Sequence, residues 1–76
     1  MSKLIYPYQN SINETFDFIN RWLPKRYTGS VNILLKKSKD PDYIRKVKNR
    51  KLQDEAVIDA LYKVSLFNKI QVETET

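Results

Sequence analysis

Cysteine and histidine are absent from this chain of 76 residues, and glycine occurs only once. Without cysteine and histidine the chain has no disulfide, no thiolate nucleophile and almost no means of building a zinc or transition-metal site. The single glycine, Gly29, excludes the glycine-rich loops that cradle phosphates. We therefore expect no metal and no cofactor. We also expect no enzymatic activity, because Asp40 and Asp42 suit a helix start better than an acid–base pair.

Long apolar runs are also missing. No stretch approaches the ~18 apolar residues of a membrane span, and the first ten residues contain no cleavage site typical of a signal peptide. We therefore expect a cytoplasmic protein without a membrane partner. Hydrophobic residues make up 41% of the chain, which is enough for one compact domain and too much for a disordered tail.

Positive charge is concentrated in one stretch, residues 36–51. This stretch contains eight basic and two acidic residues, whereas the rest of the chain has six basic and seven acidic residues and is nearly neutral. The basic residues are Lys36, Lys37, Lys39, Arg45, Lys46, Lys48, Arg50 and Lys51. A localised field of this kind attracts and orients a polyanion.

A helix start lies inside this basic stretch. Asp40 is a favoured N-cap residue and Pro41 suits the first helical position. The pattern predicts a short helix over residues 41–49 that turns Ile44 and Val47 inward. Its outer face then consists of Asp42, Arg45, Lys46 and Asn49. Taken alone, such a helix is explained equally well as a solvated surface.

Three further helices are expected around the basic one. The first covers residues 11–23 and begins with a Ser-x-x-Glu capping box. The second covers residues 30–37, although its short apolar run also fits a buried strand. The last runs from about 54 to 68, with Asp54 as its N-cap. The residues expected in the core are Phe16, Ile19, Trp22, Leu23, Val31, Leu34, Leu35, Val57, Ala60, Leu61 and Val64. We therefore predict an all-α fold, a small bundle of about four short helices.

A short helix, a turn, a basic helix and a capped closing helix follow one another as in a helix-turn-helix domain. The segments LPKRYTGSVNILLKK, DPDYIRKVKNRK and DEAVIDALYKV, between Leu23 and Val64, resemble the lambda-repressor-like helix-turn-helix family, in particular its short phage or mobile-element versions. The resemblance covers rather more than half of the chain. It implies that residues 30–37 support a recognition helix, residues 41–49, that lies in the major groove.

The resemblance also implies contacts with DNA. The residues placed at base edges are Asp42, Arg45 and Lys46. Those placed at phosphate or sugar are Tyr43 and Asn49. The flanking cations suited to phosphate are Lys25, Arg26, Lys36, Lys37, Lys48, Arg50 and Lys51. The chain has Asn32 and Ile33 where the family has a small residue, and Arg50 where it has a glycine. We expect Asn49 to adopt the left-handed conformation in place of that glycine.

The predicted division of the chain is an extended N-terminal arm over residues 1–10, a helix-turn-helix domain over 11–69 and a frayed tail over 70–76. We expect sequence-specific binding of double-stranded DNA by a small transcriptional regulator of a phage or mobile element. A homodimer on a palindromic site would supply the specificity that one small module lacks. The apolar stripe predicted as its dimer seam consists of Ile58, Tyr62 and Leu66.

Two other binding functions stay open. Surplus apolar and aromatic surface also fits a protein-binding module or a phage-type inhibitor of a host factor. The tripeptide Ser65-Leu66-Phe67 loosely resembles the tail of peptides that dock on bacterial sliding clamps. RNA binding is the third possibility, with bases stacked on Tyr27 or Tyr43.

Overall fold

The computed structural model of the chain describes residues 12–75, with side chains to residue 74. These residues form four helices, which are α1 (Ile12–Trp22), α2 (Thr28–Leu34), α3 (Pro41–Lys48) and α4 (Glu55–Glu75). No strand occurs in this part of the chain, so the predicted all-α bundle is confirmed and the strand alternative for the second element is wrong. The predicted N-terminal arm and the capping-box serine, Ser11, lie outside the described residues.

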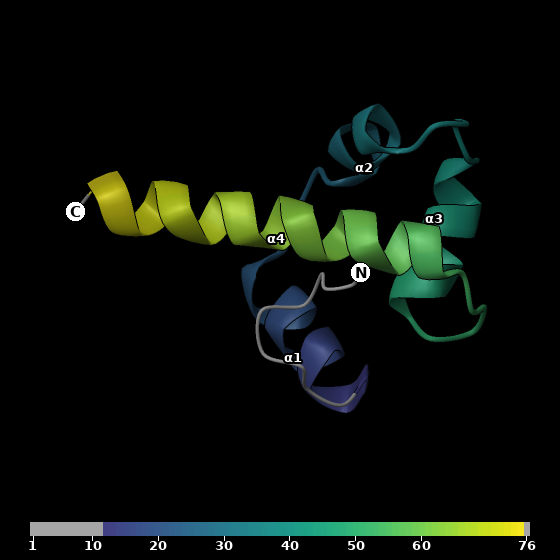
Figure 1. Cartoon of the computed structure of the whole chain (residues 1–76), viewed down its shortest axis with the longest axis horizontal. Coiled ribbons are helices and arrows are strands. Elements are labelled where there is room, and N and C mark those ends of the chain that lie inside the picture. The colour runs from purple at the N-terminus through teal and green to yellow at the C-terminus, as the bar shows by residue number, and fades with distance from the viewer. Residues whose placement is uncertain (1–11, 76) are drawn as a thin grey trace, which may run out of the picture.

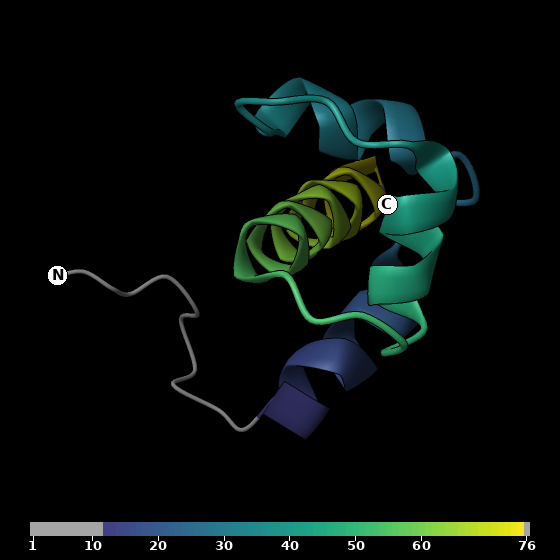
Figure 2. The same ribbon diagram turned by 90° about the vertical axis from the view of Figure 1, so that its right-hand side faces the viewer.

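Helix α4 is the central element of the bundle (Figure 1). Seen along α4, the helices α2, α3 and α1 lie on three sides of it, and no described helix covers the fourth side (Figure 2). The C-terminal end of α4 extends beyond the other three helices (Figure 1). None of the described helices has both the length and the apolar character that a membrane span requires.

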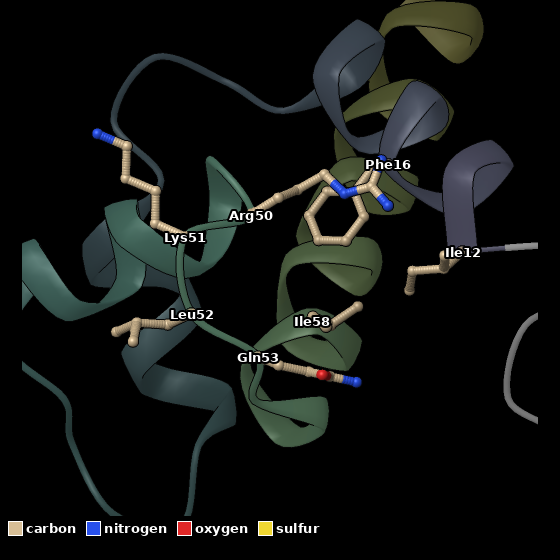
Figure 3. A pocket seen from close by; sticks show the side chains of 7 residues that line it. All are labelled: Ile12, Phe16, Arg50, Lys51, Leu52, Gln53 and Ile58. Atoms are coloured by element: carbon tan, nitrogen blue, oxygen red, sulfur yellow. The ribbon is translucent and has the colours of Figure 1, made fainter.

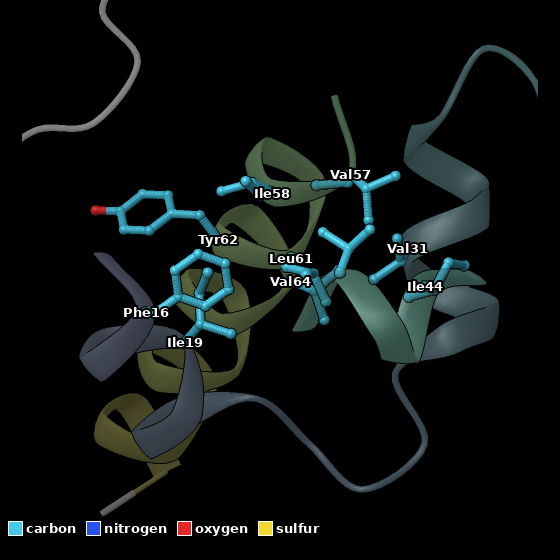
Figure 4. Packing of buried hydrophobic residues seen from close by; sticks show 11 residues of the cluster. Phe16, Ile19, Val31, Ile44, Val57, Ile58, Leu61, Tyr62 and Val64 are labelled. Carbon is cyan, nitrogen blue, oxygen red and sulfur yellow. The ribbon is translucent and has the colours of Figure 1, made fainter. Parts of the chain in front are cut away.

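The hydrophobic core forms where the three shorter helices meet α4 (Figure 4). Its buried members are Phe16, Ile19, Val31, Ile44, Val47, Val57, Ile58, Ala60, Leu61, Tyr62 and Val64. Burying each of the larger aliphatic side chains contributes about 1.5–3 kcal/mol. Among the other residues expected in the core, Trp22, Leu23 and Leu35 are half-buried, and Leu34 is 41% exposed. Because three helices pack on α4, it buries residues around most of its circumference.

The stripe predicted as a dimer seam belongs to this core. Ile58 and Tyr62 are only 4% and 2% exposed, and Leu66 is half-buried against the same cluster. The ring of Tyr62 lies 5.0 Å from the ring of Phe18 in α1. The predicted seam is therefore wrong, because α1 of the same chain covers the side of α4 that periodicity left without a partner.

Helix α4 is also longer than the sequence predicted. It continues to Glu75, so the segment after residue 69 that was expected to be a frayed tail is helical to that point. Neither proline nor glycine occurs in α4, so no residue interrupts the helix. The side chains of Lys69 and Glu73, 2.7 Å apart, form an ion pair between successive turns of this extension.

Candidate nucleic-acid interface

Helix α3 begins where the sequence predicted and ends one residue earlier. Pro41 is its first residue and Asp40 occupies the N-cap position, but the Asp40 carboxylate makes no capping hydrogen bond. The main-chain carbonyl of Asp40 accepts a hydrogen bond from the Ile44 amide at 3.1 Å. Proline has a fixed φ and lacks an amide donor, and these properties favour a helix start at Pro41 without a side-chain cap.

The two faces of α3 differ as predicted. Ile44 and Val47 are completely buried and pack in the cluster shared with α2 and α4. The residues predicted for the outer face, all of which are exposed, are Asp42, Arg45, Lys46 and Asn49. The core therefore holds α3 with its basic side facing outward.

Two of the predicted base-contacting residues form an ion pair along this outer face. A guanidinium nitrogen of Arg45 donates to the Asp42 carboxylate at 2.8 Å. Both side chains are largely exposed, so the pair adds little to stability. Asp42 instead holds the Arg45 guanidinium close to the start of α3 and partly neutralises it.

The connection between α2 and α3 is held by one side-chain amide. Asn32 donates from Nδ2 to the Lys39 carbonyl at 3.0 Å and accepts from the Lys39 amide at 2.8 Å. Helix α2 ends at Leu34 because Leu35 is extended, with φ −87° and ψ 143°. The expected range of 30–37 was therefore too late at both ends. Lys36 and Lys37 lie exposed in this connection.

Tyr43 connects α3 to the start of α4. Its hydroxyl donates to Oδ2 of Asp54 at 2.7 Å, and Oδ1 of Asp54 accepts from the Val57 amide at 3.3 Å. Asp54 therefore caps α4 as predicted. The hydrogen bond from Tyr43, followed by the bonds from the Val57 and Ala56 amides, lowers the pKa of Asp54, although burial opposes this. The same bond, together with burial and the nearby carboxylate, raises the pKa of Tyr43.

These contacts give Tyr43 a positioning role in the fold, and its contact with phosphate or sugar stays a prediction. Its ring is half-buried, and the Lys39 ammonium lies 5.1 Å from the ring centre. Tyr27, the other tyrosine considered for stacking on RNA bases, also packs against the core. Burial raises the pKa of Tyr27, while the Arg45 guanidinium opposes that shift. Neither ring is a free platform for a base.

The turn that follows α3 depends on Arg50. Arg50 has φ 64°, whereas Asn49, expected to be left-handed, has φ −88°. The Arg50 amide bonds to the Val47 carbonyl at 2.9 Å and the Lys51 amide to the Lys46 carbonyl at 2.8 Å. This pattern is a Schellman motif, in which glycine usually occupies the left-handed position. Arg50 therefore adopts the conformation that glycine usually has at this position of the motif.

The Arg50 side chain is engaged by α1. Its guanidinium lies 4.9 Å from the centre of the Phe16 ring, and Figure 3 shows it extending across that ring at the edge of a surface pocket. The pocket, about 410 Å³ in volume, lies between α1, this turn and α4. This cation–π contact fixes the position of the turn next to α1.

The remaining predicted phosphate contacts lie around α3. Lys51 follows it and is exposed, and Lys48 is half-buried at its last turn. Lys25 and Arg26 are exposed in the connection between α1 and α2, which runs on the same side of α4 as α3 (Figure 2). The fold therefore gathers basic residues from three segments on one side of α4.

Sequence reasoning missed the role of Asn32 and misjudged the tripeptide Ser65-Leu66-Phe67. Asn32 was noted only as a departure from a small residue, and its bonds depend on a loop whose shape the sequence does not reveal. The tripeptide is helical, and Ser65 is buried with its hydroxyl bonded to the Leu61 carbonyl at 2.8 Å. It is therefore not presented as an extended docking peptide.

Comparison of the chain with protein-family models, curated proteins and solved structures finds no match, so the helix-turn-helix resemblance stays a prediction.

Proposed function

We propose that this chain binds double-stranded DNA by placing α3 in the major groove, and that binding rather than catalysis is its role. The division of α3 into two faces carries the proposal. Ile44 and Val47 are fully buried, while Arg45, Lys46 and the rest of the outer face are exposed. A rigidly backed basic helix is suited to enter a groove lined with phosphates.

The dimensions of α3 support this proposal. With its side chains an α-helix is about 10–12 Å across, which fits the ~12 Å width of the major groove, and the eight residues of α3 give it a length of about 12 Å. The Arg45 guanidinium can bond to both major-groove acceptors of guanine, a contact worth about 1–3 kcal/mol of discrimination. Lys46 is suited to the same base. Asp42 sets the direction of Arg45 through their ion pair.

Cations around α3 are suited to the phosphates, which position the protein without reading sequence. Those that are exposed are Lys25, Arg26, Lys36, Lys37, Arg50 and Lys51. The biological role that we propose is a small transcriptional regulator of a phage or mobile element, on the basis of the family resemblance.

The direct test is selection of bound duplexes from a random pool by the full chain at low and at high salt. We expect an enriched motif that persists at the higher salt. An absence of enrichment, or equal enrichment of single-stranded RNA, would contradict recognition of duplex DNA.

Three variants separate base reading from phosphate contact. Arg45→Ala should lose roughly 5- to 150-fold of its preference for the selected duplex over random duplex, the equivalent of about 1–3 kcal/mol. Lys36→Ala should weaken both duplexes alike. Asp42→Asn removes a carboxylate that repels phosphate, so it should tighten binding to random duplex. Equal losses of specific and random binding with Arg45→Ala would rule out base reading by this residue.

A protein-binding function is the second candidate, because large apolar side chains are exposed on α2 and α4. Ile33 is 82% exposed and Phe67 59% exposed. Recovery of one host protein by the immobilised chain, with no shift of duplex DNA at low salt, would favour this function over the first.

A further inference from the structure

A groove with apolar walls lies between α2 and residues 64–71 of α4. This α2–α4 groove has a volume of about 450 Å³, and its apolar lining includes Ile33 and Leu34 of α2 and Val64 and Phe67 of α4. Ile33 is 82% exposed and Phe67 59% exposed, whereas Val64 is only 6% exposed. Large apolar side chains exposed side by side in this way mark an interaction site.

The α2 side of this groove is uniformly positive. Residues 23–39, which include α2 and both of its connections, contain five basic residues and no acidic one. Arg26 lines the groove itself, and Lys25, Lys36 and Lys37 are exposed near the two ends of α2. Among the described side chains, none of these four cations forms an ion pair. They are therefore available to acidic groups of a partner.

Both cations of α4, in contrast, already have partners within the chain. Lys63 pairs with Asp59 at 3.1 Å, and Lys69 pairs with Glu73 at 2.7 Å. The charge that a partner meets at this groove therefore comes from α2 and its connections. An isologous dimer on the groove would bring two copies of the positive segment 23–39 together, and repulsion between like charges disfavours that arrangement.

We propose that the α2–α4 groove binds an amphipathic helix of another protein, with its apolar face in the groove and acidic residues along its flanks. The residues that α4 contributes to the groove are Val64, Phe67, Asn68 and Gln71. Their spacing of i, i+3, i+4 and i+7 places them on one face of α4, over a length of about 10.5 Å. A docked helix with apolar anchors at i, i+3 or i+4 and i+7 has the same length.

The shape of the groove favours a helix over a lipid surface. Because Val64 is nearly buried and yet lines the groove, a ligand has to enter the groove to contact it. The side chains of a helix can do so, whereas a flat bilayer surface would contact only the protruding Ile33 and Phe67. Acidic residues beside the apolar anchors would then meet Arg26 and the lysines that follow α2.

The acidic helix and DNA would use the same cations, and this step rests on the proposed function. Arg26, Lys36 and Lys37 are exposed and are also assigned above to phosphates. A partner that neutralises them removes contacts from which the affinity for DNA comes. Docking in the α2–α4 groove would therefore regulate DNA binding by weakening it.

Two designed peptides test the docking in the absence of DNA. Both are amphipathic helices of roughly 14 residues with leucine anchors at the spacing given above, flanked by glutamate in one and by lysine in the other. In NMR titrations of the full chain, the glutamate peptide should bind roughly tenfold more tightly than the lysine peptide and should shift the amide signals of Ile33 and Phe67. Equal binding of the two peptides, or shifts confined to α1 or α3, would overturn the proposal.

Variants of the apolar residues test the position of the peptide. Ile33→Glu and Phe67→Glu should each weaken binding of the glutamate peptide by at least about tenfold, with unchanged helix content because both side chains are largely exposed. Ile12→Glu is the matched control, since Ile12 is 46% exposed on α1, and it should bind as the wild type does. Equal losses in all three variants would contradict docking in the α2–α4 groove.

Variants of the cations test the preference for acidic residues. Arg26→Ala should reduce the preference for the glutamate peptide over the lysine peptide by roughly two- to fivefold. Lys46→Ala removes an exposed cation of α3 and should leave that preference unchanged. If only Lys46→Ala reduced the preference, the peptide would lie on α3 and the proposal would fail.

Other occupants of the groove give different results. Self-association of the wild type that is lost in Phe67→Glu, measured by sedimentation, would overturn the proposal in favour of a second copy. Binding to phosphatidylserine vesicles that is lost in Ile33→Glu, without binding of either peptide, would overturn it in favour of a membrane.

Competition with DNA is measured separately. The glutamate peptide should lower the affinity of the wild type for duplex DNA and should have no such effect on Ile33→Glu. An unchanged affinity of the wild type would overturn the shared use of the cations. A chain that binds the glutamate peptide but no duplex would support the docking site and contradict only the proposed function.

Discussion

Arg50 is the residue at which local backbone preference and tertiary contact are opposed. Its left-handed conformation (φ 64°) is unfavourable for a side chain with a Cβ, by about 1–2 kcal/mol. The contact of its guanidinium with the Phe16 ring offsets part of this cost. The backbone at this turn is therefore kept by hydrogen bonds of the Schellman motif and by packing on α1.

Substitutions of Arg50 separate the two effects. Arg50→Gly and Arg50→Ala both lose the contact with Phe16, but only glycine relieves the strain, so the glycine variant should be about 1 kcal/mol more stable. Chemical denaturation provides the measurement. Lys51 is the control position. It does not have positive φ, so Lys51→Gly should be less stable than Lys51→Ala. If the glycine variant were the less stable one at both positions, the assignment of strain to Arg50 would be contradicted.

The hydrogen bond between Tyr43 and Asp54 predicts how stability depends on pH. The pKa of folded Asp54 is lowered, so its contribution is present above the ordinary aspartate value of ~4 and is lost as the pH falls through the lowered pKa. The pKa of folded Tyr43 is raised, so its contribution is present below ~10 and is lost as the pH rises through the raised pKa.

Unfolding midpoints measured from acid to alkaline pH test this bond. The wild type should lose stability at both extremes, and Tyr43→Phe should show smaller losses at both, because it lacks the hydroxyl that couples the two titrations. Tyr27→Phe is the control. Burial also raises the pKa of Tyr27, so this variant should reduce the loss at alkaline pH, but it should leave the acid limb unchanged because Tyr27 makes no such bond to Asp54. An acid limb unchanged in Tyr43→Phe would contradict the coupling.

At the scale of secondary structure, the connection between α2 and α3 depends on Asn32. Its amide makes two hydrogen bonds to the backbone of Lys39, and it thereby closes a loop that carries Lys36 and Lys37. A hydrogen bond of this kind contributes about 0.5–1.5 kcal/mol. The loop therefore keeps its cations at a defined position relative to α3.

Removal of this amide should affect both stability and the loop. Asn32→Ala is expected to lower the free energy of unfolding by roughly 1–3 kcal/mol and to speed hydrogen exchange of the Lys39 amide. Asn20→Ala, on the exposed side of α1, should change stability by less than ~0.5 kcal/mol. Similar losses in the two variants would show that the Asn32 bonds add nothing.

At the scale of the whole molecule, the chain carries a net charge of +5, and eight of its fourteen basic residues lie in the segment 36–51 that contains α3. Each phosphate that a cation neutralises releases counterions, so affinity for DNA falls with salt in proportion to the number of contacts. With six to ten contacts the affinity should fall about 10³- to 10⁵-fold between ~50 and ~200 mM salt.

Fluorescence anisotropy of a labelled duplex over this range of salt measures the slope. The double variant Lys36→Ala, Lys37→Ala should reduce the slope of log K against log salt by about 2. Lys63 is also exposed, but its partner is Asp59, 3.1 Å away, and it lies on the uncovered side of α4. Lys63→Ala should therefore leave the slope unchanged. If Lys63→Ala reduced the slope as much as the double variant at Lys36 and Lys37, the DNA would not lie against α3 and the loop before it.

The sequence by itself determined the helical class, the start of α3 at Pro41 and the inward direction of Ile44 and Val47. These features depend on proline, capping residues and periodicity, which act between residues a few positions apart. The charge contrast between the two faces of α3 follows from the same periodicity.

The tertiary structure alone decided which side of α4 is buried, because that depends on where α1 docks. Ile58 and Tyr62 formed a stripe that periodicity could not assign, and only contact with α1 places them in the core. The left-handed conformation of Arg50 likewise depends on its packing against Phe16. Contacts between residues far apart in the chain settle such choices, since local preferences at these positions are weak or point the other way.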